Sequence, residues 1–89
     1  MAKLFEVEPH VRAMIDADGA VLLDLQAGKY YSLNGMGAQI WTKAMDGEEE
    51  AAIVKTICEL YGAPEERVRA DVRAFVSGLE KKGLIRALA

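Results

Sequence analysis

The side chains able to perform covalent or metal chemistry are few and scattered along the chain. His10 is the only histidine and Cys58 the only cysteine. Nucleophilic catalysis needs a base beside the nucleophile, but His10 is far in sequence from the candidate nucleophiles Ser32, Cys58 and Ser77. A protein zinc site needs three or four nitrogen, sulfur or oxygen ligands. The sequence therefore predicts no catalytic residues, no metal site and no cofactor.

Motifs that resemble ion or phosphate sites are incomplete. Residues 16–19, Asp-Ala-Asp-Gly, resemble the start of a calcium loop but lack the third ligand position and the later bidentate glutamate. We interpret them as a hairpin turn. The glycines at 28, 35 and 37 form neither GxxxxGKS/T nor GxGxxG. The acidic run 48–50 is typical of a solvated helix start, where carboxylates suit the positive end of the helix dipole. The sequence therefore predicts a binding protein and not an enzyme.

Length and composition predict one small globular domain over residues 1–89. The apolar share is 52% and the charged share 28%, and the net charge is −3. A negative chain is a poor partner for nucleic acid. No apolar run approaches the roughly 20 residues that cross a bilayer, and the N-terminal ten residues lack the apolar core of a signal peptide. These features predict a cytoplasmic protein without a membrane partner.

The elements that must position any binding site read as three strands followed by three helices. We expect a loose or weakly paired arm over residues 1–8, because Pro9 disfavours a central strand. Strands are predicted over 11–15, 20–25 and 30–33, with turns between them that contain glycine. Residues 84–85 either add a short strand or cover the core. This order predicts an α+β domain of winged helix-turn-helix type, with a three-stranded antiparallel sheet followed by three helices.

Capping residues and apolar spacing delimit the helices. The first helix follows an Asn34 cap and runs to about Ala44; the second ends at Gly62; the third runs from Pro64 to Gly83. For the second helix, the apolar spacing predicts an inward side that comprises Ile53, Val54, Ile57, Leu60 and Tyr61. For the third helix, it predicts an inward side that comprises Val68, Val72, Phe75, Val76 and Leu79.

The tyrosine strand, which comprises Lys29, Tyr30, Tyr31, Ser32 and Leu33, is the most informative segment. It has no proline and few charges. At the edge of a sheet, such a strand offers unpaired backbone groups to another chain, and proteins use this geometry to capture extended peptides. Adjacent strand residues point to opposite faces. We therefore expect Tyr31 and Leu33 to face inward and Tyr30 and Ser32 to face outward.

DNA binding by the third helix is the alternative from another class of protein, because the third helix of a winged helix is able to enter a DNA groove. That helix carries Arg67, Arg69, Arg73, Lys81 and Lys82. Its acidic residues, Glu65, Glu66, Asp71 and Glu80, nearly cancel these charges. The turns between the strands supply no basic wing, so the sequence favours a peptide partner.

Several short motifs, each weakly specific alone, occur in an order and spacing that resemble those of the PqqD-like family. These motifs are LLDLQAGKYYSLNGMGAQIW, then MDG, then ADVRAFVSGLEKKGLI, within residues 11–85. Family members are recognition elements that hold the leader segments of ribosomal precursor peptides (RiPPs) during modification. Within the family, GKYYSLN and the following IW resemble the freestanding leader-binding protein of lasso-peptide biosynthesis. The family often has Pro-Thr after the asparagine, whereas this chain has Gly35-Met36.

The resemblance implies that a leader peptide adds as a strand along the tyrosine strand and lies against the third helix. A separate leader peptidase and cyclase would then process the precursor, and a PqqD-type chaperone for a radical SAM enzyme is the alternative. Residues 29–33 would supply backbone hydrogen bonds. The opposing wall would comprise Val68, Arg69, Val72, Phe75 and Val76, with Arg73 nearby. In this arrangement Val72 and Phe75 would receive an apolar leader anchor, and the two arginines would meet leader carboxylates.

Overall fold

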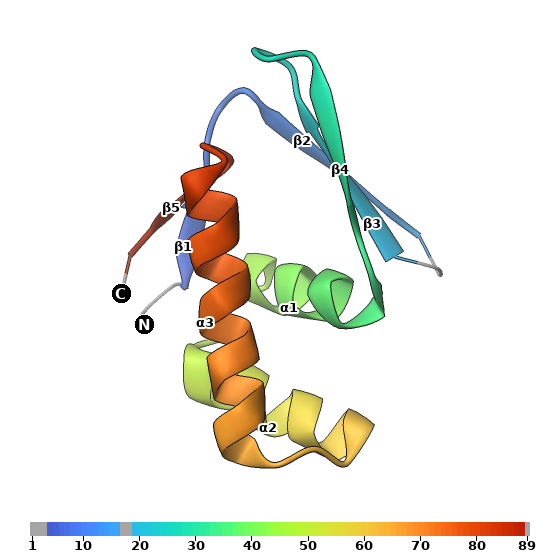
Figure 1. Ribbon diagram of the computed structural model, residues 1–89, viewed down its shortest axis with the longest axis vertical. Coiled ribbons are helices and arrows are strands. Elements are labelled where there is room, and N and C mark those ends of the chain that lie inside the picture. Colours follow the sequence, from blue (N-terminus) through green and yellow to red (C-terminus); the bar gives the residue numbers. More distant parts are fainter. Residues whose placement is uncertain (1–3, 17–18, 89) are drawn as a thin grey trace.

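A computed structural model of the chain describes residues 4–16 and 19–88, which form a sheet of three strands, a cluster of three helices and a second small sheet (Figure 1). In chain order the elements are β1 (Phe5–Val7), β2 (Val11–Asp16), β3 (Gly19–Asp24), β4 (Lys29–Leu33), α1 (Gly35–Met45), α2 (Glu50–Tyr61), α3 (Glu65–Lys81) and β5 (Ile85–Ala87). The predicted α+β class, with a three-stranded antiparallel sheet followed by three helices, is confirmed.

The three-stranded sheet has the order β2–β3–β4, and both pairings are antiparallel. Along β3, Ala20, Leu22 and Asp24 are buried while the residues between them are only half-buried, as the two-residue period of a strand requires. Gly19 starts β3 with φ of +150°, and a Cβ at this position would lie 2.5 Å from the carbonyl oxygen of Leu33. Glycine is therefore required where β3 passes the end of β4.

The core lies between the helices and the inner face of this sheet. Its largest fully buried side chains include Trp41 of α1, Leu22 of β3 and Ile53 of α2. The predicted inward side of α2 holds for Ile53, Val54 and Ile57, but Leu60 and Tyr61 are 58% and 48% exposed. That part of the prediction was wrong. The two residues lie in the last turn of α2, which ends at Gly62 in the left-handed conformation. Other elements leave them largely uncovered, although the Tyr61 hydroxyl lies near Gly35 of α1.

A loose or weakly paired arm was expected over residues 1–8. Residues 1–3 lie outside the described part of the chain, and residues 5–7 form the short paired strand β1. Strand β1 pairs antiparallel with β5, with Phe5 opposite Ala87, and Figure 1 shows the two strands side by side. Phe5 is only 1% exposed, and the centre of its ring lies 5.3 Å from that of Trp41. The short strand is thus held by a partner strand from the opposite end of the chain.

We expect Phe5→Ala to destabilise the domain by about 3–5 kcal/mol, because it removes a fully buried aromatic ring and leaves a cavity against Trp41. Denaturation in urea, followed by tryptophan fluorescence and circular dichroism, measures this change. Leu25→Ala is the matched control, because Leu25 is 59% exposed and should cost less than about 0.5 kcal/mol. Equal stability of the Phe5 variant and the wild type would show that β1 is a dispensable arm.

Candidate functional site

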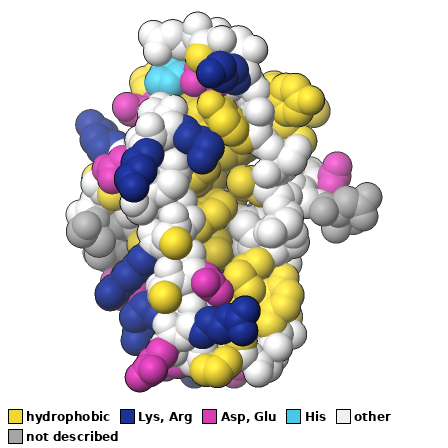
Figure 2. All heavy atoms as spheres, viewed as in Figure 1, with side chains coloured by type: hydrophobic (Ala, Val, Ile, Leu, Met, Phe, Trp, Pro, Cys, Tyr) yellow, Lys and Arg dark blue, Asp and Glu magenta, His cyan; other side chains and the backbone are white. Residues whose placement is uncertain are grey.

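A cleft of about 510 Å³ lies between β4 and α3. Figure 2 shows hydrophobic side chains gathered along the hollow beside α3, on the side that faces the sheet. Two elements supply its lining residues: Tyr30, Tyr31, Ser32 and Leu33 from β4, and Ala74, Phe75, Gly78, Leu79 and Lys82 from α3 and its C-terminal cap. The cleft is therefore a mainly apolar channel with a strand along one side and a helix along the other.

Strand β4 is an edge strand. It pairs with β3 on one side, and among the described residues no strand pairs with its other side. The predicted orientation of its side chains is confirmed: Tyr30 is 70% exposed and Ser32 is exposed, whereas Tyr31 and Leu33 are half-buried and pack against the core. The alternate backbone N–H and C=O groups of β4 thus remain available for an added strand.

Side chains at both ends of β4 fix its position. Before the strand, the buried carboxylate of Asp24 accepts hydrogen bonds from the backbone N–H groups of Gln26 and Ala27, at 3.0 and 2.9 Å. After the strand, the Asn34 side chain accepts a hydrogen bond from the Gly37 N–H at 2.9 Å and caps α1, as the sequence predicts. These bonds hold the turn before β4 and the junction between β4 and α1.

The α3 wall of the cleft changes in character along its length. At one end the Phe75 ring packs close to α1, and a Cβ built on Gly37 would lie 3.2 Å from its Cε1 atom. In the middle, a Cβ built on Gly78 would meet no heavy atom within 4 Å, so this glycine leaves a notch in the helix surface. At the other end, the Lys82 Nζ lies 5.8 Å from the centre of the Tyr31 ring.

The structure brings together only some of the predicted site residues. Phe75 faces the strand residues across the cleft, whereas Lys29, which starts β4, is exposed and is not among the residues that line the cleft. Val68 and Val72 are 0% exposed and Val76 is 8% exposed, so these three valines belong to the core. They do not line the β4–α3 cleft, because the inward stripe of α3 and its cleft-facing side are largely different sides of the helix. Their predicted contact with a peptide stays a prediction.

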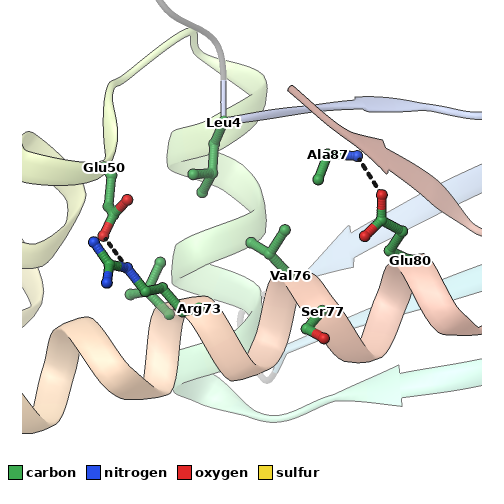
Figure 3. A pocket seen from close by; sticks show the side chains of 8 residues that line it. Leu4, Glu50, Arg73, Val76, Ser77, Glu80 and Ala87 are labelled. Atoms are coloured by element: carbon green, nitrogen blue, oxygen red, sulfur yellow. Dashed lines mark hydrogen bonds and ion pairs between the residues drawn. The ribbon is translucent and has the colours of Figure 1, made fainter. Parts of the chain in front are cut away.

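Arg69 and Arg73 lie away from the cleft, at the contact between α3 and α2. Both pair with the Glu50 carboxylate: the Nε of Arg73 donates a hydrogen bond at 2.9 Å, and that of Arg69 lies 3.8 Å away. Figure 3 shows Arg73 pointing toward Glu50 at a second cavity of about 340 Å³, which Val76 and Ser77 also line. Neither arginine lines the β4–α3 cleft, where the sequence placed Arg69 in the wall and Arg73 nearby. Their predicted contact with leader carboxylates stays a prediction.

Four residues of the α3 wall escaped the sequence analysis: Ala74, Gly78, Leu79 as a cleft residue, and Lys82. Three of them follow Phe75 at intervals of three, four and seven residues, which is the spacing of one helix face. A search for this face, starting from Phe75, would have found them. In the sequence, Lys82 is one of several basic residues at the end of the helix, and Gly78 has no side chain that would indicate a binding role.

Other kinds of site receive no support in the described part of the chain. No group of three or more His, Cys, Asp or Glu side chains there is arranged to hold a metal ion. None of the helices within those residues combines the length and the apolar character that crossing a membrane requires. The β4–α3 cleft is therefore the site whose geometry carries the functional argument.

An open edge strand beside a helix-lined cleft is the geometry that proteins use to capture extended peptides by strand addition. The family model described as coenzyme PQQ synthesis protein D (PqqD) matches residues 19–85. The chain belongs to the PqqD family, and the resemblance noted in the sequence is confirmed. No curated protein sequence matches the chain.

Two solved structures are similar to this chain over nearly their whole length. One is TbiB1 in complex with the TbiA(beta) leader peptide, with 32% sequence identity and a TM-score of 0.86. The other is a lasso peptide synthetase B1 complexed with the leader peptide, with 27% identity and a TM-score of 0.87. In both comparisons the match covers 94% of this chain and 98% of the other.

We expect Gly78→Ala to stabilise the domain by about 0.5–1 kcal/mol, because alanine favours the helix and the added methyl group meets open space. Ala74→Gly is the matched control on the same side of α3, and should lower stability by a similar amount. Urea denaturation of the two variants measures both effects. Loss of stability in Gly78→Ala would show that the notch is filled in the native protein.

Proposed function

We propose that this protein is a RiPP recognition element that binds the leader of a precursor peptide as an added strand along β4 and against α3. It presents the bound precursor to a separate leader peptidase and cyclase in lasso-peptide biosynthesis. The protein itself is non-catalytic in this scheme, since those two enzymes perform the chemistry. We place it in the cytoplasm, where ribosomes make the precursor.

The unpaired edge of β4, set beside an apolar cleft, is the observation that carries this proposal. Strand addition satisfies the backbone of the peptide and of β4 together, and it does so for any peptide sequence. The side chains of α3 then select among peptides, because alternate residues of the added strand face the helix. The similar structures of TbiB1 and of the lasso peptide synthetase B1, each in complex with a leader peptide, support the same reading.

The affinity expected of such a carrier is moderate. An extended peptide loses conformational entropy when it is ordered on a protein, which limits the affinity for a given contact area. A dissociation constant near 1 μM corresponds to about −8 kcal/mol. That value suffices to hold a leader while still allowing the processed precursor to leave.

A second candidate function is that of a PqqD-type peptide chaperone for a radical SAM enzyme. The description of the matching family, coenzyme PQQ synthesis protein D, favours it specifically. Both candidates use the β4–α3 cleft in the same way and differ in the enzyme that receives the cargo. Reconstitution of the protein and its precursor with either a leader peptidase or a radical SAM enzyme distinguishes them.

We expect Phe75→Ala to weaken binding of the leader half of the precursor encoded beside this chain by at least about tenfold, because a half-buried aromatic anchor is lost. Fluorescence anisotropy of a labelled leader measures the dissociation constant. Arg73→Ala is the matched control on the opposite side of the same helix, and should change it by less than about twofold.

Circular dichroism and thermal melting establish that both variants are folded. Unchanged affinity in folded Phe75→Ala, or an equal loss in Arg73→Ala, would move the peptide away from the β4–α3 cleft. Binding of duplex DNA with a steep dependence on salt, without leader binding, would instead favour the alternative from another class, a winged-helix DNA-binding regulator.

A further inference from the structure

Strand β4 and helix α3 run in opposite directions along the cleft. At one end, a Cβ built on Gly37 would touch both the Phe75 ring and the Leu33 Cβ, at 3.2 and 3.5 Å. At the other end, Lys82 lies over the ring of Tyr31. The cleft therefore runs from Leu33 and Phe75 at one end to Tyr31 and Lys82 at the other, so residue numbers fall along β4 while they rise along α3. Figure 1 shows the same arrangement, with α3 and β4 alongside one another.

A turn of α3 and two residues of a strand added along β4 advance by similar distances along the cleft. Successive turns of a helix are separated by about 5.4 Å, and alternate residues of a strand by about 6.6–6.8 Å. A strand added along β4 therefore presents its α3-facing side chains, one after another, to successive turns of the helix. Three levels follow along α3: Phe75, then Gly78 with Leu79, then Lys82.

Each level has its own chemistry. Phe75 is half-buried and apolar. Gly78 opens a notch, beside which the Leu79 side chain is 5% exposed, so this level has room for a bulky apolar group. Lys82 is the one charged side chain among the described residues that line the cleft. Nearby, Glu80 belongs to the opposite side of α3, where its carboxylate accepts a hydrogen bond from the Ala87 N–H (Figure 3).

The Lys82 end of the cleft is therefore cationic. Lys29 starts β4 two residues before Tyr31, which places a second exposed ammonium group at the same end of the strand. The adjacent Lys81 is also exposed but does not line the cleft. A carboxylate on the bound peptide at this level would meet positive charge, whereas a peptide lysine or arginine there would meet repulsion.

We propose that the cleft selects peptides by a two-residue repeat: apolar side chains at two successive α3-facing positions and a carboxylate at the third. The bulky apolar side chain that fills the notch at Gly78 is thus two residues away from the Asp or Glu that pairs with Lys82. This inference rests on the proposed function, and it assigns Gly78 and Lys82 as its specificity-determining residues. The order of the three positions reverses if the peptide runs in the other direction.

Selection from a displayed library of random 12-residue peptides on the immobilised full chain tests this pattern. The wild type should enrich Asp and Glu two residues from a bulky apolar position by about threefold over the starting library, which is the gain expected from an exposed ion pair. Lys82→Glu should enrich Lys and Arg at that position instead. Gly78→Leu should replace the bulky apolar residue with Gly, Ala or Ser. Lys81→Glu is the matched control and should keep the acidic preference.

The outcomes separate the inference from the function on which it rests. If the folded wild type enriches no alternating pattern, both fail. If it enriches alternating apolar residues without the acid, or if Lys82→Glu still selects the acid, strand capture stands and the role of Lys82 is overturned. Should Lys82→Glu be unfolded by circular dichroism, Lys82→Gln replaces it, and the acidic preference should then disappear without a basic one taking its place.

Discussion

Strand β4 must be held firmly while one of its edges stays unpaired, and the rest of the structure depends on this constraint. An unpaired edge strand is free to slip or to pair with other chains unless something fixes its position. Here β3 pairs with its inner edge, the Asp24 carboxylate organises the turn before it, and Asn34 joins its end to α1. Gly19 lets β3 pass within contact distance of the Leu33 carbonyl. These contacts fix the position of the open edge within the fold.

Helix α3 serves three surfaces at once, and this explains how the cleft keeps its shape. Its inward valines, among them Val68 and Val72, are fully buried and anchor the helix in the core. A second side carries Arg73, which pairs with Glu50 of α2 but is 68% exposed and therefore contributes little stability. The third side, from Phe75 to Lys82, faces β4. Packing of the first side positions the third, and Leu79, which lines the cleft and is also part of the core, joins the two.

Much of this arrangement is predictable from the sequence, because local signals determine it. The alternation in residues 20–24 predicts β3, and the run of residues 29–33 predicts β4. The Asn34 cap predicts the start of α1. The structure confirms all three. The burial of Phe5 was not predictable, because its strand pairs with β5, about 80 residues away. The division of α3 between core and cleft also depends on the orientation of the helix. Its apolar stripe alone does not reveal that Val72 is covered while Phe75 is open on one side.

Amide hydrogen exchange of β4, measured by NMR with and without the leader peptide, tests the central claim most directly. If the leader adds as a strand, alternate amides within Lys29–Leu33, those that point away from β3, exchange rapidly in the free protein and become strongly protected when the leader is bound. The amides already paired with β3 should change little. Full binding of the leader with no added protection along β4 would contradict strand addition, and would place the peptide on another surface of the domain.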